Sequence, residues 1–344
     1  MAQTRVLVTG GSGFIAGHCV LRLLDQGCLV RTTVRSPERE GAVRAVLADA
    51  GMVRGDALSF AAADLTGEEG WDEAVSGCDY VLHVASPVRP GHVRNEDEII
   101  APARDGALRV LRAARDAGVR RVVLTSAFHA VGWGHPRTGR TFTEDDWTVL
   151  DGPGTDAYGR SKTLAERAAW DFAAAEGGPM ELATVLPVAV MGPVLGERVS
   201  GPNHIVQRLL AGRMPGYPDL YLPIVDVRDV AGAHVAAMTA DGAAGRRFLV
   251  SSGPAIALKE IGAILRTRLG AAAKRVPTRS IPSAVVRTAA VFSAEYRPVA
   301  AELGYARKVS SDRARRVLGW RPRTSEEAVL AAAESLIRKS LVTG

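Results

Sequence analysis

The amino-acid sequence predicts an α/β protein built on a doubly wound, mostly parallel sheet. Runs of apolar and β-branched residues alternate with helix-like segments over most of the 344 residues, with short connections between them. A glycine-rich turn also follows the first such run and precedes the first helix. Both observations are typical of a doubly wound sheet, in which ligands bind beyond the carboxyl ends of the strands.

The glycine-rich turn lies in the segment Val6–Ala16, which predicts a strand, a tight turn and the start of a helix. Gly10 and Gly11 allow the sharp turn. Gly13 lets the backbone approach a pyrophosphate, and the small Ala16 lets the helix pack closely on the strand. The N-terminus of this helix offers unpaired N–H groups and a positive dipole to phosphate. The alternative is an ordinary glycine-rich turn between a strand and a helix.

The second strand, Leu29–Val34, ends at Arg35. In a dinucleotide-binding fold, an acidic residue at this position favours the 2′-hydroxyl of NAD, whereas an arginine accommodates the 2′-phosphate of NADP. Arg35 therefore favours NADP(H). Arg39 and Arg44 on the next helix could add charge to the same pocket, although a solvated helix face is the more usual position for such side chains.

The following segments continue the alternation. Strands are predicted over residues 58–63, 79–84, 121–124, 181–186 and 247–251. Helices are predicted over residues 71–75, about 95–117, from 158 through 170, 204–210 and 326–338, with an alanine-rich helix after residue 230. Residues 132–154 are expected to form a loop. The predicted strand ends carry small or polar residues, which suits the edge of a sheet where a cofactor lies.

Composition limits the class of protein. An apolar fraction of 47% and a charged fraction of 23% are typical of a soluble globular protein. The three cysteines show no CxxC or metal-ligand spacing, which favours a reducing, cytoplasmic location and no metal. We expect neither a membrane nor a nucleic-acid partner. No apolar run reaches the length of a membrane span, no secretory leader is seen, and the net charge of +6 is dispersed.

Tyr158 and Lys162 are four residues apart and share one face of a predicted helix. A tyrosine is a poor acid–base group at neutral pH because its pKa is ~10. A nearby ammonium favours the phenolate and lowers that pKa toward the working range. The pair therefore predicts a group that can transfer a proton near neutral pH. An exposed Tyr–Lys pair without function is the alternative.

The order of these motifs resembles that of extended short-chain dehydrogenases/reductases. In detail it is similar to the branch of dihydroflavonol reductases, cinnamoyl-CoA reductases and bacterial aldehyde/ketone reductases. The resemblance covers nearly the whole chain. It rests on Thr9-Gly10-x-x-Gly13-x-x-Ala16, Thr33-Val34-Arg35, Asp64-Leu65, Val84-Ala85-Ser86, Tyr158-x-x-x-Lys162, Pro187-Val188-Ala189-Val190, residues 225–230 and residues 314–320.

The resemblance implies a Rossmann-like cofactor domain and a smaller, mostly C-terminal lobe that covers the substrate. We place the cofactor domain at residues 1–188 plus about 224–251, and the lobe at about 189–223 and 252–344. The family implies contacts to the pyrophosphate from Gly10, Gly13, Phe14 and Ile15, to the 2′-phosphate from Arg35, and to the adenine from Asp64 and Leu65. It implies contacts to the nicotinamide ribose from Val84, Ala85, Ser86 and Lys162, and to the nicotinamide from residues 187–190, with Pro187 and Val190 at the ends.

The chain departs from this family at one catalytic position. The usual motif after the fifth strand is Thr-Ser-Ser, whose last serine holds the substrate carbonyl. Here the segment reads Thr125-Ser126-Ala127-Phe128-His129, so Ala127 stands at the serine position without a hydroxyl. We predict that Ser126 or Thr125 substitutes, and strand alternation puts Thr125 on the same face as Ala127. A substrate that brings its own polar group is an alternative. His129 could also substitute, although it is more readily interpreted as a loop histidine.

These observations predict NADPH-dependent reduction of a ketone or aldehyde, with Tyr158 as proton donor. Candidate pocket walls are residues 87–92, 128–134 and 191–221, where Trp133, Tyr217 and Tyr221 favour an apolar or aromatic substrate. A sugar-nucleotide epimerase or dehydratase and a non-catalytic NADP-binding regulator are the alternatives. We expect a monomer or a homodimer.

Overall fold

A computed structural model describes residues 3–87, 95–293 and 296–342 of the chain. Its centre is a seven-stranded sheet in the order β11-β7-β5-β4-β1-β2-β3, and every neighbouring pair is parallel. The strands are β1 (Arg5–Val8), β2 (Leu29–Val34), β3 (Leu58–Ala62), β4 (Tyr80–His83), β5 (Arg121–Thr125), β7 (Glu181–Pro187) and β11 (Arg246–Val250). The doubly wound fold predicted from the sequence is confirmed.

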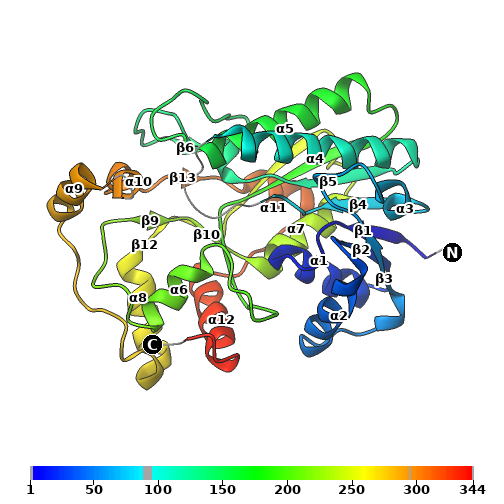
Figure 1. Cartoon of the computed structure of the whole chain (residues 1–344). Helices are drawn as coiled ribbons and strands as arrows, with labels where there is room; N and C mark the ends of the chain where they lie inside the picture. Colours follow the sequence, from blue (N-terminus) through cyan, green and yellow to red (C-terminus); the bar gives the residue numbers. More distant parts are fainter. Residues whose placement is uncertain (1–2, 88–94, 294–295, 343–344) are drawn as a thin grey trace.

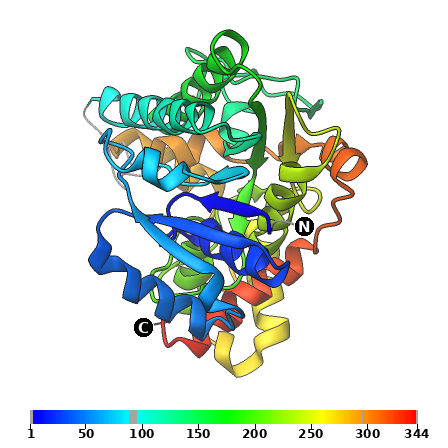
Figure 2. The same ribbon diagram turned by 90° about the vertical axis from the view of Figure 1, so that its right-hand side faces the viewer.

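Helices cover both faces of this sheet, and the two layers are visible in Figures 1 and 2. One face packs against α3 (Trp71–Val75), α4 (Asp97–Asp116) and α5 (Ala157–Ala175). The other packs against α1 (Phe14–Asp25), α2 (Glu40–Asp49), α7 (Val227–Thr239) and α11 (Asp312–Leu318). Strand order reverses between β1 and β4, so the crevice where a dinucleotide binds in such folds lies beyond their carboxyl ends.

A third apolar cluster lies outside the sheet layers. It joins α6 (Asn203–Leu210), α8 (Leu258–Leu269) and α12 (Ser325–Arg338). Two short strand pairs flank it: β8 (Ala189–Met191) with β10 (Ile224–Asp226), and β9 (Tyr221–Leu222) with β12 (Ile256–Ala257). Helices α9 (Ser283–Phe292) and α10 (Arg297–Glu302) follow α8 in the chain. Our domain boundaries remain a prediction.

The segment expected to be a loop, residues 132–154, contains a strand. β6 (Thr141–Phe142) pairs in parallel with β13 (Lys308–Val309), which brings a late part of the chain back to this segment. Short 3₁₀ turns occur at Pro37–Arg39, Gly55–Ala57, Phe128–Ala130 and Gly270–Ala273. In the part of the chain that the structure describes, no helix combines the length and apolar character needed to cross a membrane.

Helix α5 begins at a defined position because Asp156 caps it. The Asp156 carboxylate accepts a hydrogen bond from the backbone N–H of Gly159 at 2.8 Å, which satisfies one of the unpaired donors of the first turn. The cap therefore fixes the position of Tyr158, which is the second residue of the helix.

Candidate active site

The glycine turn has the conformation that its sequence predicts. Gly10 adopts a positive φ of 76°, and a Cβ atom there would lie 3.0 Å from the Cβ of Ala85. Its backbone N–H donates to Thr33 Oγ1 at 2.8 Å, while the N–H of Gly13 donates to the carbonyl of Gly10 at 2.8 Å. The turn is therefore held in place directly before Phe14, where helix α1 presents its free N–H groups.

Thr9 ties the end of β1 to the end of β4. Its Oγ1 accepts hydrogen bonds from the backbone N–H groups of Val84 and Ala85, at 3.0 and 2.9 Å. The same oxygen lies 2.9 Å from Nδ1 of His83, and burial lowers the pKa of this histidine to about 3. The neutral imidazole accepts the Thr9 proton, and the segment from Val84 to Ser86 is fixed beside the glycine turn.

Arg35 lies at the end of β2 with its side chain 72% exposed. Its Nε is 3.7 Å from Oδ2 of Asp64, the residue that follows β3 by two positions. Asp64 accepts hydrogen bonds from the backbone N–H and the hydroxyl of Thr66, which hold the pKa of the carboxyl below its usual range. The structure thus brings Arg35 and Asp64 together and leaves most of the guanidinium accessible.

The other two arginines of this region differ from one another. Arg39 is exposed at the end of a 3₁₀ turn. Arg44 donates to the carbonyl oxygens of Gly55 and Leu58 and lies over the ring of Phe60. Arg44 therefore joins α2 to β3 and is not directed to a phosphate pocket.

Leu65 lies beneath helix α4. Gly106 of that helix approaches so closely that a Cβ there would lie 3.0 Å from the Cβ of Leu65. Arg109 of the same helix donates to the Leu65 carbonyl at 2.8 Å. The turn containing Asp64 and Leu65 is thereby fixed at the carboxyl end of β3.

Lys162 is almost fully buried and reaches across from α5 to β4. Its Nζ donates to Ser86 Oγ at 3.0 Å and lies 5.9 Å from the centre of the Tyr158 ring. Burial lowers the pKa of Lys162 to about 8, and the negative charge of Glu166 partly opposes this shift. The Lys162 ammonium therefore contacts Ser86 and lies close to Tyr158, the residue predicted to act as acid–base group.

The pKa of Tyr158 differs from our expectation. Burial raises it to about 12, and the negative charge of Asp156 acts in the same direction. The expected lowering by Lys162 is wrong for this structure, because loss of hydration outweighs an ammonium whose hydrogen bond is directed to Ser86. The phenol is consequently protonated at neutral pH, which is the form that can donate a proton.

The hydroxyl of Thr125 points to helix α7. Its Oγ1 lies 2.7 Å from Nε2 of His234, whose Nδ1 lies 2.8 Å from the carbonyl oxygen of Val230. A carbonyl only accepts, so Nδ1 carries the proton of this imidazole, whose pKa burial lowers to about 4. Nε2 is then an acceptor, and Thr125 donates its hydroxyl proton to it.

The hydroxyl of Ser126 points to the opposite face, toward α5. It donates to Oε2 of Glu166 at 2.6 Å. This buried carboxylate also accepts from Arg247 Nε at 2.8 Å and from the hydroxyl of Thr184 at 2.9 Å. The predicted alternation of Thr125 and Ser126 is therefore confirmed, and both hydroxyl protons are donated to protein acceptors.

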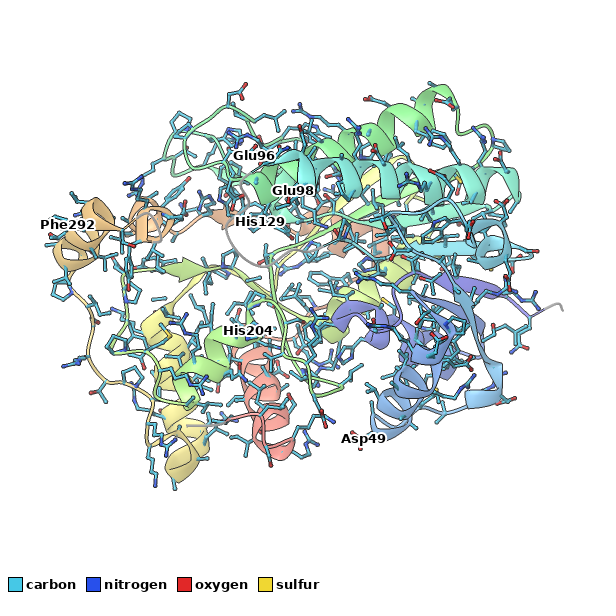
Figure 3. The ribbon with its side chains drawn as sticks, in the orientation of Figure 1. Asp49, Glu96, Glu98, His129, His204 and Phe292 are labelled. Carbon is cyan, nitrogen blue, oxygen red and sulfur yellow. The ribbon has the colours of Figure 1, made fainter. Side chains whose placement is uncertain are left out.

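Ala127 is buried and precedes the short turn that carries His129. The imidazole of His129 stacks on Trp133, with ring centres 3.9 Å apart, and meets the edge of Tyr158 at 4.9 Å. Arg307 lies over the ring of Trp133 at 4.5 Å. In the view of Figure 3, His129 lies below helices α4 and α5. The structure brings His129 into contact with Tyr158, although the sequence analysis interpreted it more readily as a loop histidine than as a substitute for the serine.

A small cavity is lined by the ends of β4 and β5 and by helices α4 and α5. Its volume is about 20 Å³, enough for a single water molecule. Polar side chains line it: His83, Ser86, Thr125, Ser126, Lys162 and Glu166. Of the predicted pocket walls, residues 88–92 lie outside the described residues.

The predicted nicotinamide segment continues from β7 into β8. The backbone N–H of Val188 donates to the carbonyl of Val250, and that of Ala189 to the carbonyl of Pro223. Val190 then pairs with Val225 in β10. Pro187 and Val190 therefore lie at the carboxyl end of the sheet, as the sequence predicts.

Sequence comparison identifies the family. Residues 6–251 match the model of the NAD dependent epimerase/dehydratase family. The chain belongs to this family. Two relatives place it in the branch that resembles dihydroflavonol and cinnamoyl-CoA reductases. Cinnamoyl-CoA reductase 1 of Arabidopsis thaliana is 36% identical over 73% of this chain and 71% of its own length. An anthocyanidin reductase of Vitis vinifera is 34% identical over 80% of this chain and 82% of its own.

A solved structure supports the fold. The structure of Gre2 in complex with NADPH from Candida albicans has a TM-score of 0.79 and 25% identity, covering 98% of this chain and 99% of that one. The predicted extended short-chain dehydrogenase/reductase is thus confirmed.

The sequence analysis did not identify several residues that hold the side chains of the site in place. Glu166 lies four positions beyond Lys162 on α5, a spacing that could have placed it on the same face. His83 and Arg247 gave no such signal, because their partners are distant in the sequence, and the motif that contains Thr9 did not indicate its contact with His83.

Proposed function

We propose that this protein reduces a ketone or aldehyde to the corresponding alcohol with NADPH. One observation carries the proposal: Lys162 and Tyr158 lie together on α5, and the Lys162 ammonium is bonded to Ser86 at the end of β4, next to the glycine turn. The names of the relatives support it, since the two plant proteins above are reductases. The substrate class is small carbonyl compounds, with an aromatic or apolar body.

The residues present fit a dinucleotide with a 2′-phosphate. The positive φ of Gly10 and the start of α1 leave the N–H groups of Phe14 and Ile15 for a pyrophosphate, which Gly10 and Gly13 would line. The exposed guanidinium of Arg35 would hold the 2′-phosphate. The remaining contacts would come from Asp64 and Leu65 to the adenine, Val84, Ala85 and Ser86 to the ribose, and Pro187 to Val190 at the nicotinamide.

When bound, NADPH supplies the hydride that the carbonyl carbon receives. The neutral phenol of Tyr158 donates its proton to the carbonyl oxygen as negative charge develops there. The resulting phenolate is buried, so it needs a nearby positive charge. Lys162 supplies that charge at a pKa of about 8, and its ammonium, which donates to Ser86, would also hold the nicotinamide ribose.

The proposal is tested by measuring NADPH consumption with a panel of aromatic and aliphatic aldehydes, ketones and 1,2-diketones. We expect consumption of NADPH with at least one member and formation of its alcohol. Tight NADPH binding with no turnover would support a non-catalytic regulator instead. Conversion of a sugar nucleotide, with no reduction of any carbonyl compound in the panel, would support the alternative function of an epimerase or dehydratase.

A further inference from the structure

The site lacks a second hydrogen-bond donor at the position where the family has a serine. Ala127 has no hydroxyl, and the protons of its neighbours are donated to His234 and Glu166. A carbonyl reduced beside Tyr158 develops negative charge on its oxygen, and a single phenol leaves half of that oxygen's lone-pair capacity unused. The question is which other group lies close to Tyr158.

His129 is such a group. Its ring centre lies 4.9 Å from that of Tyr158, with the two planes at 77°. His129 lies two residues beyond Ala127, in the short turn that follows β5. Its side chain is half-buried.

The ring nitrogens of His129 distinguish it from the other described histidines. Nitrogens of His18, His83, His135, His204 and His234 each lie within hydrogen-bond distance of a protein atom. Among the residues that the structure describes, His129 has no such partner at either nitrogen. Among the described residues, Ser252 Oγ is the one fully buried polar side-chain atom without a partner, so the nitrogens of the half-buried His129 are not sealed off and can meet a ligand.

The orientation of His129 is fixed by its surroundings. The hydroxyl of Thr148 donates to the His129 carbonyl at 2.7 Å and accepts from the backbone N–H of Trp133 at 3.1 Å. The rings of His129 and Trp133 stack nearly in parallel, with 13° between their planes. A donor held in this way loses little conformational entropy when it meets a substrate.

We propose that the His129 imidazole donates a hydrogen bond to the substrate carbonyl oxygen beside Tyr158 and thereby replaces the serine that is absent at Ala127. His129 keeps its proton throughout. The hydride adds to the carbonyl carbon, the Tyr158 proton goes to the oxygen, and the products are the alcohol, the oxidised cofactor and the Tyr158 phenolate. The inference rests on the proposed reductase function.

Burial supports this role because it lowers the pKa of His129 to about 4. The imidazole is therefore neutral at neutral pH, with one N–H to donate. A neutral imidazole can polarise a carbonyl in this way without becoming a proton source that competes with the tyrosine.

The test compares His129→Phe with the wild-type protein, using the carbonyl compound of the panel that the wild type reduces fastest. Phenylalanine keeps the stacking on Trp133 and removes the N–H. We expect kcat to fall by roughly 10²–10³, the loss typical of one oxyanion donor, with the NADPH dissociation constant unchanged. His135→Phe is the matched control, since His135 lies a few residues further along and its Nε2 bonds to the Val131 carbonyl, and this variant should keep its activity.

Rescue separates a donor from a structural residue. Adding Ala127→Ser to His129→Phe returns a hydroxyl to the family position, and we expect it to recover at least about tenfold of the lost kcat. A His129→Phe protein with wild-type kcat overturns the inference, as does a loss of kcat that Ala127→Ser leaves unchanged in a correctly folded double variant. A wild-type protein that binds NADPH and reduces no carbonyl instead overturns the proposed function, and the inference with it.

Discussion

The ammonium nitrogen of Lys162 lies 3.0 Å from the hydroxyl oxygen of Ser86, so a single hydrogen bond joins the second turn of α5 to the end of β4. Ser86 follows β4, and its neighbours Val84 and Ala85 are held by Thr9. The position of the lysine is therefore coupled to the strand end where the nicotinamide ribose is proposed to bind.

Replacing Lys162 should consequently affect two properties at once. Lys162→Met keeps the length of the side chain and removes its charge, so we expect both a lower kcat and a weaker affinity for NADPH. Steady-state kinetics and titration of NADPH fluorescence measure the two effects. A change in kcat alone, with wild-type affinity, would show that the ammonium does not contact the cofactor.

Tyr158 is proposed to be the proton donor. Tyr158→Phe should lower kcat by roughly 10²–10⁴, the range typical of general acid–base catalysis, while NADPH still binds. Single-turnover measurements with NADPH already bound isolate the chemical step. The assignment fails if the phenylalanine variant retains most of the wild-type rate.

Arg35 is proposed to select the cofactor. Its guanidinium can pair with two oxygens of a 2′-phosphate, so Arg35→Ala should weaken NADPH binding while NADH binding changes little. Arg44→Ala is a useful comparison, because Arg44 bonds to backbone carbonyls and should alter stability without altering the NADPH/NADH ratio. Equal losses for both cofactors in Arg35→Ala would contradict the proposed contact.

Thr125 should matter more for stability than for turnover. Thr125→Val leaves Nε2 of the buried His234 without a donor, which typically costs about 1–3 kcal/mol of unfolding free energy. Urea denaturation measures this loss. A drop of about tenfold or more in kcat at wild-type stability would support Thr125 in our sequence-based prediction that Ser126 or Thr125 replaces the family serine.

Acidification should destabilise the fold. Burial lowers the pKa of His18, His83 and His234 from 6.5 to about 4, about 3 and about 4. Between pH 6.5 and pH 4 the unfolded chain binds more protons at these positions than the folded chain, so the unfolding free energy decreases as the pH falls. Urea titrations at several pH values test the sign. A stability that is constant or increases on acidification through this range would contradict it.

The fold and the cofactor side of the site follow from local sequence patterns. The Gly10 turn and the ends of β2 and β4 lie where their periodicity and small residues predict, because each depends on neighbours in the chain. The pKa of Tyr158 could not be predicted in this way, since its direction depends on how deeply the folded protein buries the phenol. The contact of His129 with Tyr158 could not be predicted either. It depends on the path of the turn after β5, and the alternation of side chains along β5 does not determine that path.

The pairing of β6 with β13 has a consequence for exchanging parts between relatives. Arg307 precedes β13, donates to the Gly132 carbonyl at 3.0 Å and covers Trp133, while Arg137 donates to the carbonyl of Leu303 at 3.0 Å. A chimera that takes its last forty or so residues from another reductase therefore breaks contacts made by residues 132–142. Substrate preference should transfer only when the two segments are moved as a unit, although more than 150 residues separate them in the chain.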